Sequence, residues 1–173
     1  MNLYEWCFET YLVHRRQRFW RIRDLDQAIL DRGPTKNFDY LVQLGAESAA
    51  LIEVKGRSFP TAGGSKWENW VTRGDLEALL AWSQEFGPTT VGLLVFLYRL
   101  TDHDVVPKRA WTPIALEEKR FGAVAVDVET YRAHARVRSA KWNTLSVPHR
   151  TFTEIVRPVA EWLPAGEEIY AGG

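Results

Sequence analysis

The chain has 173 residues, of which 46% are hydrophobic and 13% aromatic, so it has the apolar content of a folded protein rather than a disordered one. Its 22 basic and 22 acidic residues give a formal net charge of zero, which is unusual for a protein that grips nucleic acid over a large surface. Its single cysteine excludes a disulfide framework and a cysteine-based zinc cluster. The length suits one α/β domain, which we expect to span residues 1–173.

The N-terminus has no signal-peptide pattern, because its opening residues alternate apolar side chains with Glu5 and Glu9. The longest apolar run, residues 91–98, is far too short to span a bilayer. We therefore expect a cytoplasmic protein that does not associate with membranes.

The first half of the chain begins with an amphipathic pattern. Tyr4, Phe8, Tyr11 and Leu12 recur at helical spacing, which predicts a helix over 2–17. The elements expected after it are a short strand over 19–23, a helical turn over 24–32 closed by Gly33-Pro34, strands over 38–44 and 50–55, and a loop over 56–70.

The second half begins with a clear helix start. Thr72 with Asp75 three residues later resembles a capping box, and Gly87-Pro88 would end the helix after Phe86. The near-continuous apolar run 91–98 predicts a central strand buried on both faces. The remaining expected elements are a strand over 123–126, a helix over 128–138 and a last helix over 151–163. This order predicts an α/β domain with a mixed sheet flanked by helices.

Two strands carry charged residues among apolar ones. Strand periodicity places Glu53 and Lys55 on one face, and Asp39 joins them only if the hairpin loop has an odd number of residues or a compensating bulge. The segment 45–49 allows either arrangement. The position of Asp39 therefore depends on the phase of this hairpin.

These residue types suit a divalent metal held against a phosphodiester. Mg²⁺ prefers oxygen ligands, which Asp39, Glu53 and the backbone carbonyl of Val54 would supply. Lys55 would orient a metal-activated water or neutralise charge that develops in the transition state. The alternative is that Glu53 and Lys55 form an ordinary charged pair on an exposed strand face.

The first helix adds two more carboxylates beside its apolar stripe. Glu5 and Glu9 lie one turn apart, and Glu9 is the better candidate to complete a metal site. Alternatively, both are solvated residues that pair with Arg15 or Arg16.

Basic residues cluster despite the neutral total. Residues 131–150 contain five Lys or Arg and no acid, and combine this charge with the aromatic Trp142. Two stretches of chain supply candidate nucleic-acid contacts, namely Lys66, Trp67, Arg73, Arg136, Arg138 and Lys141. The alternatives are core packing for Trp67 or Trp70 and an ordinary solvated surface for the basic stretch.

The pattern Asp39 … Glu53-Val54-Lys55, with a glutamate-bearing helix before it and a helix and buried strand after it, resembles the PD-(D/E)XK nuclease superfamily. Residues 4–9 and 68–73 also resemble a bacterial family named for its HYExAFE motif, although Leu3 and Cys7 replace the His and Ala of that motif. Phe38 replaces the proline for which the superfamily is named.

The resemblance implies a core of helix, three strands, helix and strand, which is a restriction-endonuclease-like fold. It implies Asp39 and Glu53 as metal ligands, Lys55 as the catalytic lysine and Glu9 as the acid of the first helix. It further implies Mg²⁺ or Mn²⁺ as the cofactor, DNA as the partner and a possible homodimer. We therefore expect a metal-dependent nuclease for DNA, possibly branched or damaged DNA. The alternative is a catalytically silent module on the same fold that binds nucleic acid or protein.

Overall fold

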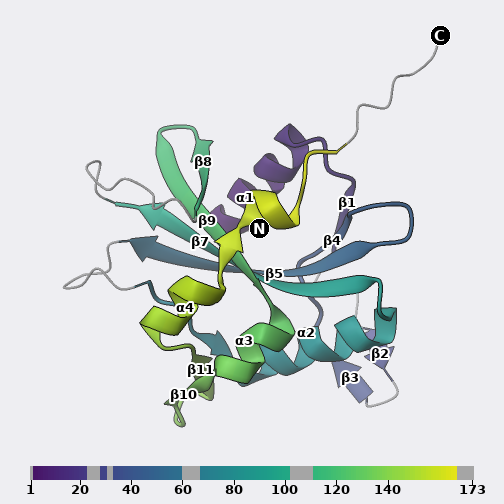
Figure 1. The fold of residues 1–173 in the computed structure, drawn as a ribbon, viewed down its shortest axis with the longest axis vertical. Helices are drawn as coiled ribbons and strands as arrows, with labels where there is room; N and C mark the ends of the chain where they lie inside the picture. Colours follow the sequence, from purple (N-terminus) through teal and green to yellow (C-terminus); the bar gives the residue numbers. More distant parts are fainter. Residues whose placement is uncertain (1, 23–27, 31–32, 60–66, 102–110, 167–173) are drawn as a thin grey trace.

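A mixed β-sheet with helices on both faces forms the centre of the computed structural model, which describes residues 2–22, 28–30, 33–59, 67–101 and 111–166 (Figure 1). The strands follow one another across the sheet as β1 (Phe19–Arg21), β4 (Tyr40–Gln43), β5 (Ala49–Phe59), β7 (Thr90–Leu100), β9 (Lys119–Asp127) and β12 (Arg157–Pro158), and β8 (Thr112–Leu116) pairs with β9. Only the β5–β7 pair of this sheet is parallel among the described strands.

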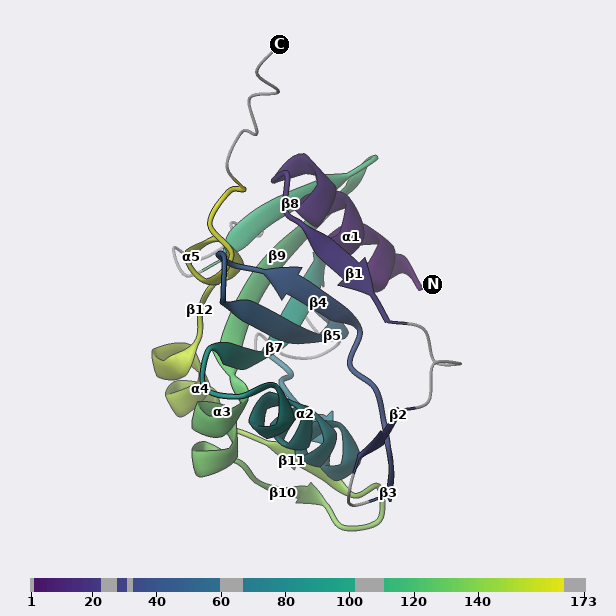
Figure 2. The same cartoon turned by 90° about the vertical axis from the view of Figure 1, so that its right-hand side faces the viewer.

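Two capped helices cover opposite faces of the sheet (Figure 2). Helix α1 (Leu3–His14) begins at a capping box between Asn2 and Glu5. Helix α2 (Arg73–Phe86) begins at the predicted capping box of Thr72 and Asp75. It ends at Gly87, whose φ of 90° favours glycine. The sequence prediction for α2 is therefore confirmed.

Side chains of β5 alternate between two hydrophobic clusters, one on each face. Leu51 packs in the cluster under α2, whereas Ile52 packs in the cluster under α1. The neighbouring strand β7 is fully buried from Leu93 to Tyr98, which confirms the central strand predicted from the apolar run. No helix among the described residues is both long and apolar enough to cross a membrane.

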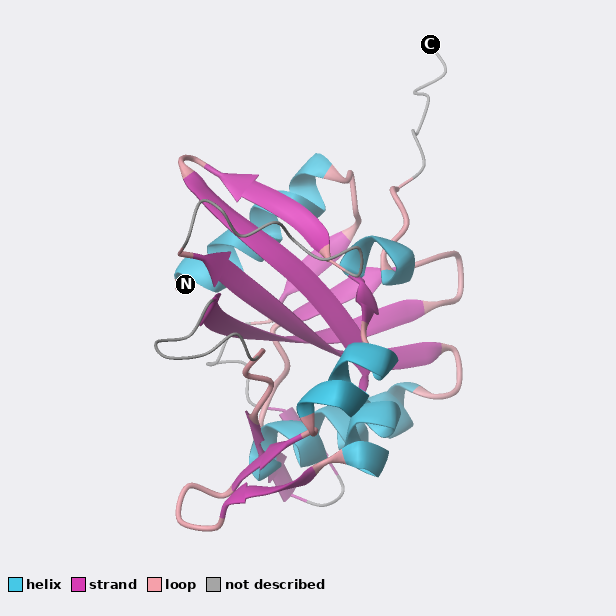
Figure 3. Cartoon of the chain, turned by 60° about the vertical axis from the view of Figure 1, so that its left-hand side comes forward, coloured by secondary structure: helices cyan, strands magenta, loops and turns pink. Residues whose placement is uncertain are grey.

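The remaining elements lie at the end of the molecule around α2 (Figure 3), except the last short helix, whose Val159 packs in the cluster under α1. A small sheet contains β6 (Val71–Thr72), β11 (Thr144–Ser146) and β10 (Arg136–Ser139), and a separate hairpin contains β2 (Ala28–Leu30) and β3 (Gly33–Thr35). The short helices are α3 (Val128–His134), α4 (His149–Ile155) and α5 (Val159–Trp162).

Four predictions of secondary structure were wrong. The loop expected over 56–70 is strand at its start, because β5 continues to Phe59. The helix expected over 128–138 ends at His134, because the next residues pair with β11 as a strand. The helix expected over 151–163 is interrupted by β12, where Pro158 has no amide proton to donate to a helix. Residues 28–30 form a strand rather than a helical turn, while the rest of 24–32 lies outside the described residues.

Candidate active site

The hairpin between β4 and β5 brings Asp39 and Glu53 to the same face of the sheet. Tyr40 pairs with Ile52 and Gln43 with Ala49, so five residues lie between the last paired positions. This odd loop places Asp39, one residue before β4, opposite Glu53. The Asp39 carboxylate accepts a hydrogen bond from the Val54 backbone amide at 2.7 Å, which holds it against β5. The hairpin loop is therefore odd, as the sequence required for Asp39 to share a face with Glu53 and Lys55.

Glu53 and Lys55 contact one another on the face that α2 covers. Lys55 Nζ lies 2.7 Å from Glu53 Oε1, and the Glu53 residue is only 5% exposed. They are therefore not a charged pair on an open strand face. Burying charge is costly without compensation, so this pair needs further partners.

Two residues that the sequence did not assign to the site supply those partners. Asp75, in the first turn of α2, accepts a hydrogen bond from Lys55 Nζ at 2.6 Å. Lys36 donates to Asp75 and also lies 3.2 Å from Glu53 Oε1. The two lysines and two carboxylates thus alternate around a closed set of ion pairs. Their formal charges cancel, which leaves Asp39 as an additional, partly buried carboxyl group.

The pKa values of the charged groups reflect this excess of negative charge. Burial and the neighbouring charge of Glu53 raise the pKa of Asp39 to about 7, despite the Val54 hydrogen bond and Lys55. Burial also tends to raise the pKa of Asp75, but Lys55 and Lys36 overcome it and lower the value to about 2. Burial tends to lower the pKa of Lys36, but the charge of Glu53 and its contacts with Asp75 raise it overall. Asp39 is therefore the group that lacks a cation.

The site fits a divalent cation in its chemistry. Asp39 and Glu53 offer hard oxygen ligands, and an added cation would relieve the repulsion that raises the Asp39 pKa. The Lys36 ammonium already bridges two carboxylates, which shows that this place accepts positive charge. No group of three or more His, Cys, Asp or Glu suited to a metal occurs within the described ranges. Mg²⁺ can bind at a site with only one or two carboxylates, because it keeps several of its water ligands.

Helix α1 lies on the other face, so Glu9 is placed differently from Asp39, Glu53 and Lys55. Glu9 accepts a hydrogen bond from the hydroxyl of buried Tyr40, at 3.4 Å. Glu5, which the sequence made the weaker candidate, is the α1 residue whose charge contributes to the raised pKa of Asp39. It forms an ion pair with Arg21 at 3.4 Å. A metal-binding role for Glu9 stays a prediction.

Trp67 is a core residue, which corrects its suggested role as a stacking surface for bases. Its ring is 3% exposed and lies 4.6 Å from the ring of Trp111, centroid to centroid. The structure therefore confirms the alternative that Trp67 packs in the core. Trp70 is half-buried instead, with the Arg57 guanidinium 4.0 Å from its ring centroid. Lys66 lies outside the described residues.

The other basic candidates lie together at the N-terminal end of α2. Arg136 and Arg138 are exposed on β10, and Lys141 is exposed in the turn that follows. Arg73 begins α2 and donates from Nε to the Asn143 side chain at 3.3 Å. β10 belongs to the same small sheet as β6, which leads into α2, so Arg136, Arg138 and Lys141 lie in the part of the fold that also contains Arg73.

The sequence contained one signal for Asp75 and none for Lys36. Asp75 was recognised as a capping residue, and a helix that starts beside a charged strand can direct its first-turn acid toward that strand. Lys36 precedes β4 in a segment without periodicity, so only the fold brings it to Glu53.

No protein-family model matches the chain, and no curated protein matches it by sequence. Among solved structures, it is similar to Hjc of Archaeoglobus fulgidus, a Holliday junction resolvase from an archaeal hyperthermophile. The TM-score is 0.53 over 95% of this chain and 96% of that one, with 11% sequence identity. This likeness shows the fold, so the predicted restriction-endonuclease-like class is confirmed. The resemblance to the HYExAFE family stays a prediction.

Proposed function

We propose that the chain is a metal-dependent nuclease that hydrolyses phosphodiester bonds in DNA. One observation carries the proposal: Asp39, a partly buried carboxyl group short of positive charge, lies beside Glu53 and Lys55 on one face of the sheet. A purely structural ion-pair cluster gains nothing from an additional uncompensated carboxyl group. A site that receives a cation and a phosphate does gain from it.

Each residue has a definite role in the proposal. Asp39 and Glu53 hold the cation, together with the Val54 carbonyl, which follows Glu53 on the same strand. Lys55 places its ammonium where it stabilises negative charge on the phosphate or orients the attacking water. Asp75 holds Lys55 in position. The cation, Mg²⁺ or Mn²⁺, supplies Lewis-acid polarisation of the phosphate and a water of lowered pKa.

Branched DNA is the substrate we favour. The fold is similar to that of a Holliday junction resolvase, and the basic residues lie on the α2 side, next to Asp75. Arg73, Arg136, Arg138 and Lys141 would contact phosphates there. The neutral net charge is compatible with this role because the basic residues are gathered rather than dispersed.

The test compares cleavage of four-way junctions, duplexes and single strands with Mg²⁺, Mn²⁺ or EDTA. Wild type should cut junctions only with metal, and Asp39→Asn should not cut. Glu117→Gln removes a carboxylate at the distant β8–β9 turn and serves as the matched control. Metal-independent cutting, or equal loss in both variants, contradicts the proposal.

A catalytically silent binding module is the second candidate. It is favoured by the saturation of Glu53 with two lysines, which leaves that carboxylate already compensated without metal. Junction binding by wild type with no cleavage under any metal would support this candidate over the first.

A further inference from the structure

A basic hairpin, here called the arm and defined as residues 136–146, projects from the end of the molecule near α2 (Figure 3). Its sequence contains Arg136, Arg138 and Lys141 and no acid. At its turn, the Trp142 side chain is 68% exposed, and Lys141 Nζ lies 5.3 Å from the centroid of that ring. A large exposed aromatic ring beside cations offers a face on which a nucleic-acid base can stack, with positive charge nearby for the phosphates.

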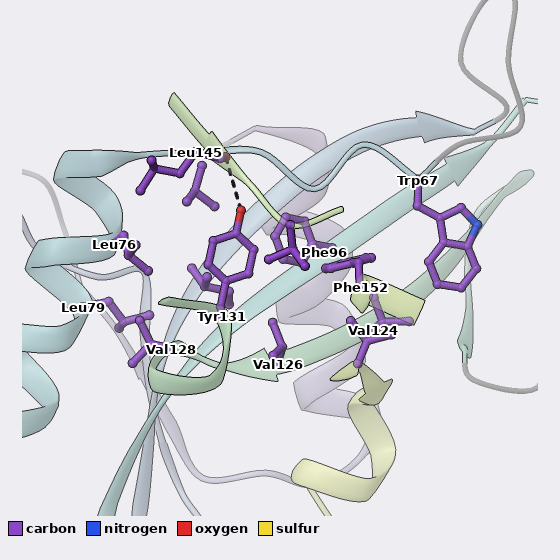
Figure 4. Packing of buried hydrophobic residues seen from close by; sticks show 14 of the residues in the cluster. Trp67, Leu76, Leu79, Phe96, Val124, Val126, Val128, Tyr131, Leu145 and Phe152 are labelled. Carbon is purple, nitrogen blue, oxygen red and sulfur yellow. Dashed lines mark hydrogen bonds between the residues drawn. The ribbon is translucent and has the colours of Figure 1, made fainter. Parts of the chain in front are cut away.

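The base of the arm is locked into the core. The side-chain amide of buried Asn69 donates to the Val147 carbonyl at 3.0 Å and accepts from the Val147 amide at 2.8 Å. The Tyr131 hydroxyl contacts the carbonyls of Asn69 and Leu145, at 2.6 Å and 3.3 Å (Figure 4). The arm therefore cannot pivot freely at its base.

The turn of the arm is tied to the helix that carries Asp75. The Arg73 amide donates to the Asn143 carbonyl at 2.9 Å, and Arg73 Nε donates to the Asn143 side chain. Thr72, the N-cap of α2, pairs with Thr144. Trp142 precedes this anchor by one residue. The aromatic tip is therefore held at a set position relative to the candidate active site.

Positive charge continues from the candidate active site toward the arm. Arg57 follows Lys55 by two residues on β5, so both side chains lie on the same face. Arg57 lies over Trp70 at 4.0 Å, and the Arg138 guanidinium lies 5.4 Å from the same ring. Glu68 offsets part of this charge, at 3.7 Å from Arg138.

These features together suit DNA that exposes an unstacked base. In a continuous duplex both faces of every base are covered by neighbours, whereas a branch point, gap or end leaves one face open. Stacking of an aromatic side chain on such a face is favourable for any base, and nearby cations bind the flanking phosphates. A continuous duplex offers the phosphates but no base face.

We infer that the arm recognises the interruption in a branched DNA substrate, with Trp142 stacked on the exposed base and Arg136 and Lys141 on adjacent phosphates. This inference rests on the proposed function and specifies how that site selects its substrate. Trp142 determines specificity, whereas the two cations contribute affinity without regard to branching.

The test is fluorescence anisotropy of labelled DNA in EDTA, which needs no cleavage. Trp142→Ala should weaken binding of a four-way junction by about 5- to 150-fold while leaving unchanged the binding of a long uninterrupted duplex, in which ends are few beside the interior sites. Trp142→Phe should retain most of the preference. Val137→Ala, which removes the other exposed apolar side chain of the arm, is the matched control and should bind both like wild type.

Equal weakening of both DNAs by Trp142→Ala, or no weakening of either, overturns the inference. Arg136→Ala and Lys141→Ala should weaken both DNAs alike and reduce the salt dependence of binding. If wild type binds junctions more tightly than duplex because of Trp142 but never cuts them, the proposed nuclease activity is refuted and the inference stands. Junction cleavage that is as fast in Trp142→Ala as in wild type refutes only the inference.

Discussion

Lys55 Nζ donates to Asp75 Oδ2 at 2.6 Å, so one hydrogen bond joins the middle of β5 to the first turn of α2. Asp75 also completes the capping box of its helix, because its carboxylate accepts a hydrogen bond from the Thr72 backbone amide at 3.4 Å while its own amide donates to the Thr72 hydroxyl. A single residue thus sets where α2 begins and where the lysine ammonium lies. Asp75 therefore belongs both to the candidate active site and to the start of α2.

Asp75→Asn should lower cleavage about 10- to 100-fold through misplacement of Lys55. Asparagine keeps an oxygen for the cap but loses the charge that holds the ammonium. We expect kcat to fall while KM changes little, as measured in single-turnover and steady-state assays. Glu77→Gln, an exposed carboxylate on the same helix, is the control. Equal activity of the two variants would show that Asp75 serves the fold alone.

The raised pKa of Asp39 predicts how metal changes stability. A carboxyl group with a folded-state pKa of about 7, above its ordinary 3.8, binds its proton more tightly in the folded protein. Its contribution to the free energy of unfolding is therefore largest at low pH and falls as pH rises from about 4 to about 7. A cation beside the ionised carboxylate reverses this loss.

Thermal unfolding with and without Mg²⁺ measures this effect. The metal should raise the Tm of wild type more at pH 8 than at pH 5, and Asp39→Asn should lose both the response and the pH-dependent decline. A metal response in Asp39→Asn as large as that of wild type would place the cation elsewhere.

Trp67→Ala should destabilise the protein by about 3–5 kcal/mol, because it opens a cavity between the rings of Trp111 and Tyr98. Denaturant unfolding measures the loss. Trp142→Ala removes an equally large ring from the surface and should leave the free energy of unfolding almost unchanged. Similar losses in both variants would mean that Trp67 is not part of the core.

Strand periodicity gave the condition for aligning Asp39 with Glu53 and Lys55, namely an odd hairpin loop or a bulge, but the segment 45–49 left the loop length open until the structure fixed it. Helix α2 could be predicted, since Thr72, Asp75 and Gly87 are local signals at its ends. Lys36 could not be found this way. Its contact with Glu53 joins residues 17 positions apart without any repeating pattern.

The basic stretch shows a different limit. Residues 128–138 have the composition of a helix end, yet Val137 pairs with Leu145 and turns the stretch into an arm. What decides this is tertiary: Asn69 binds the backbone of Val147, 78 residues away, and fixes the partner strand. Local propensity has no information about that contact. β8 was missed because Pro113 lies within it, although its position in the outer strand tolerates a proline.

The central claim is tested most directly by cleavage of a four-way junction by wild type, Lys55→Ala and Lys119→Ala in Mg²⁺. Lys119 is a matched lysine at the distant β8–β9 turn. We predict that wild type and Lys119→Ala cut the junction alike, whereas Lys55→Ala is slower by about 10²–10³-fold with its fold intact. Cleavage by Lys55→Ala at the wild-type rate would contradict a nuclease site at Asp39, Glu53 and Lys55.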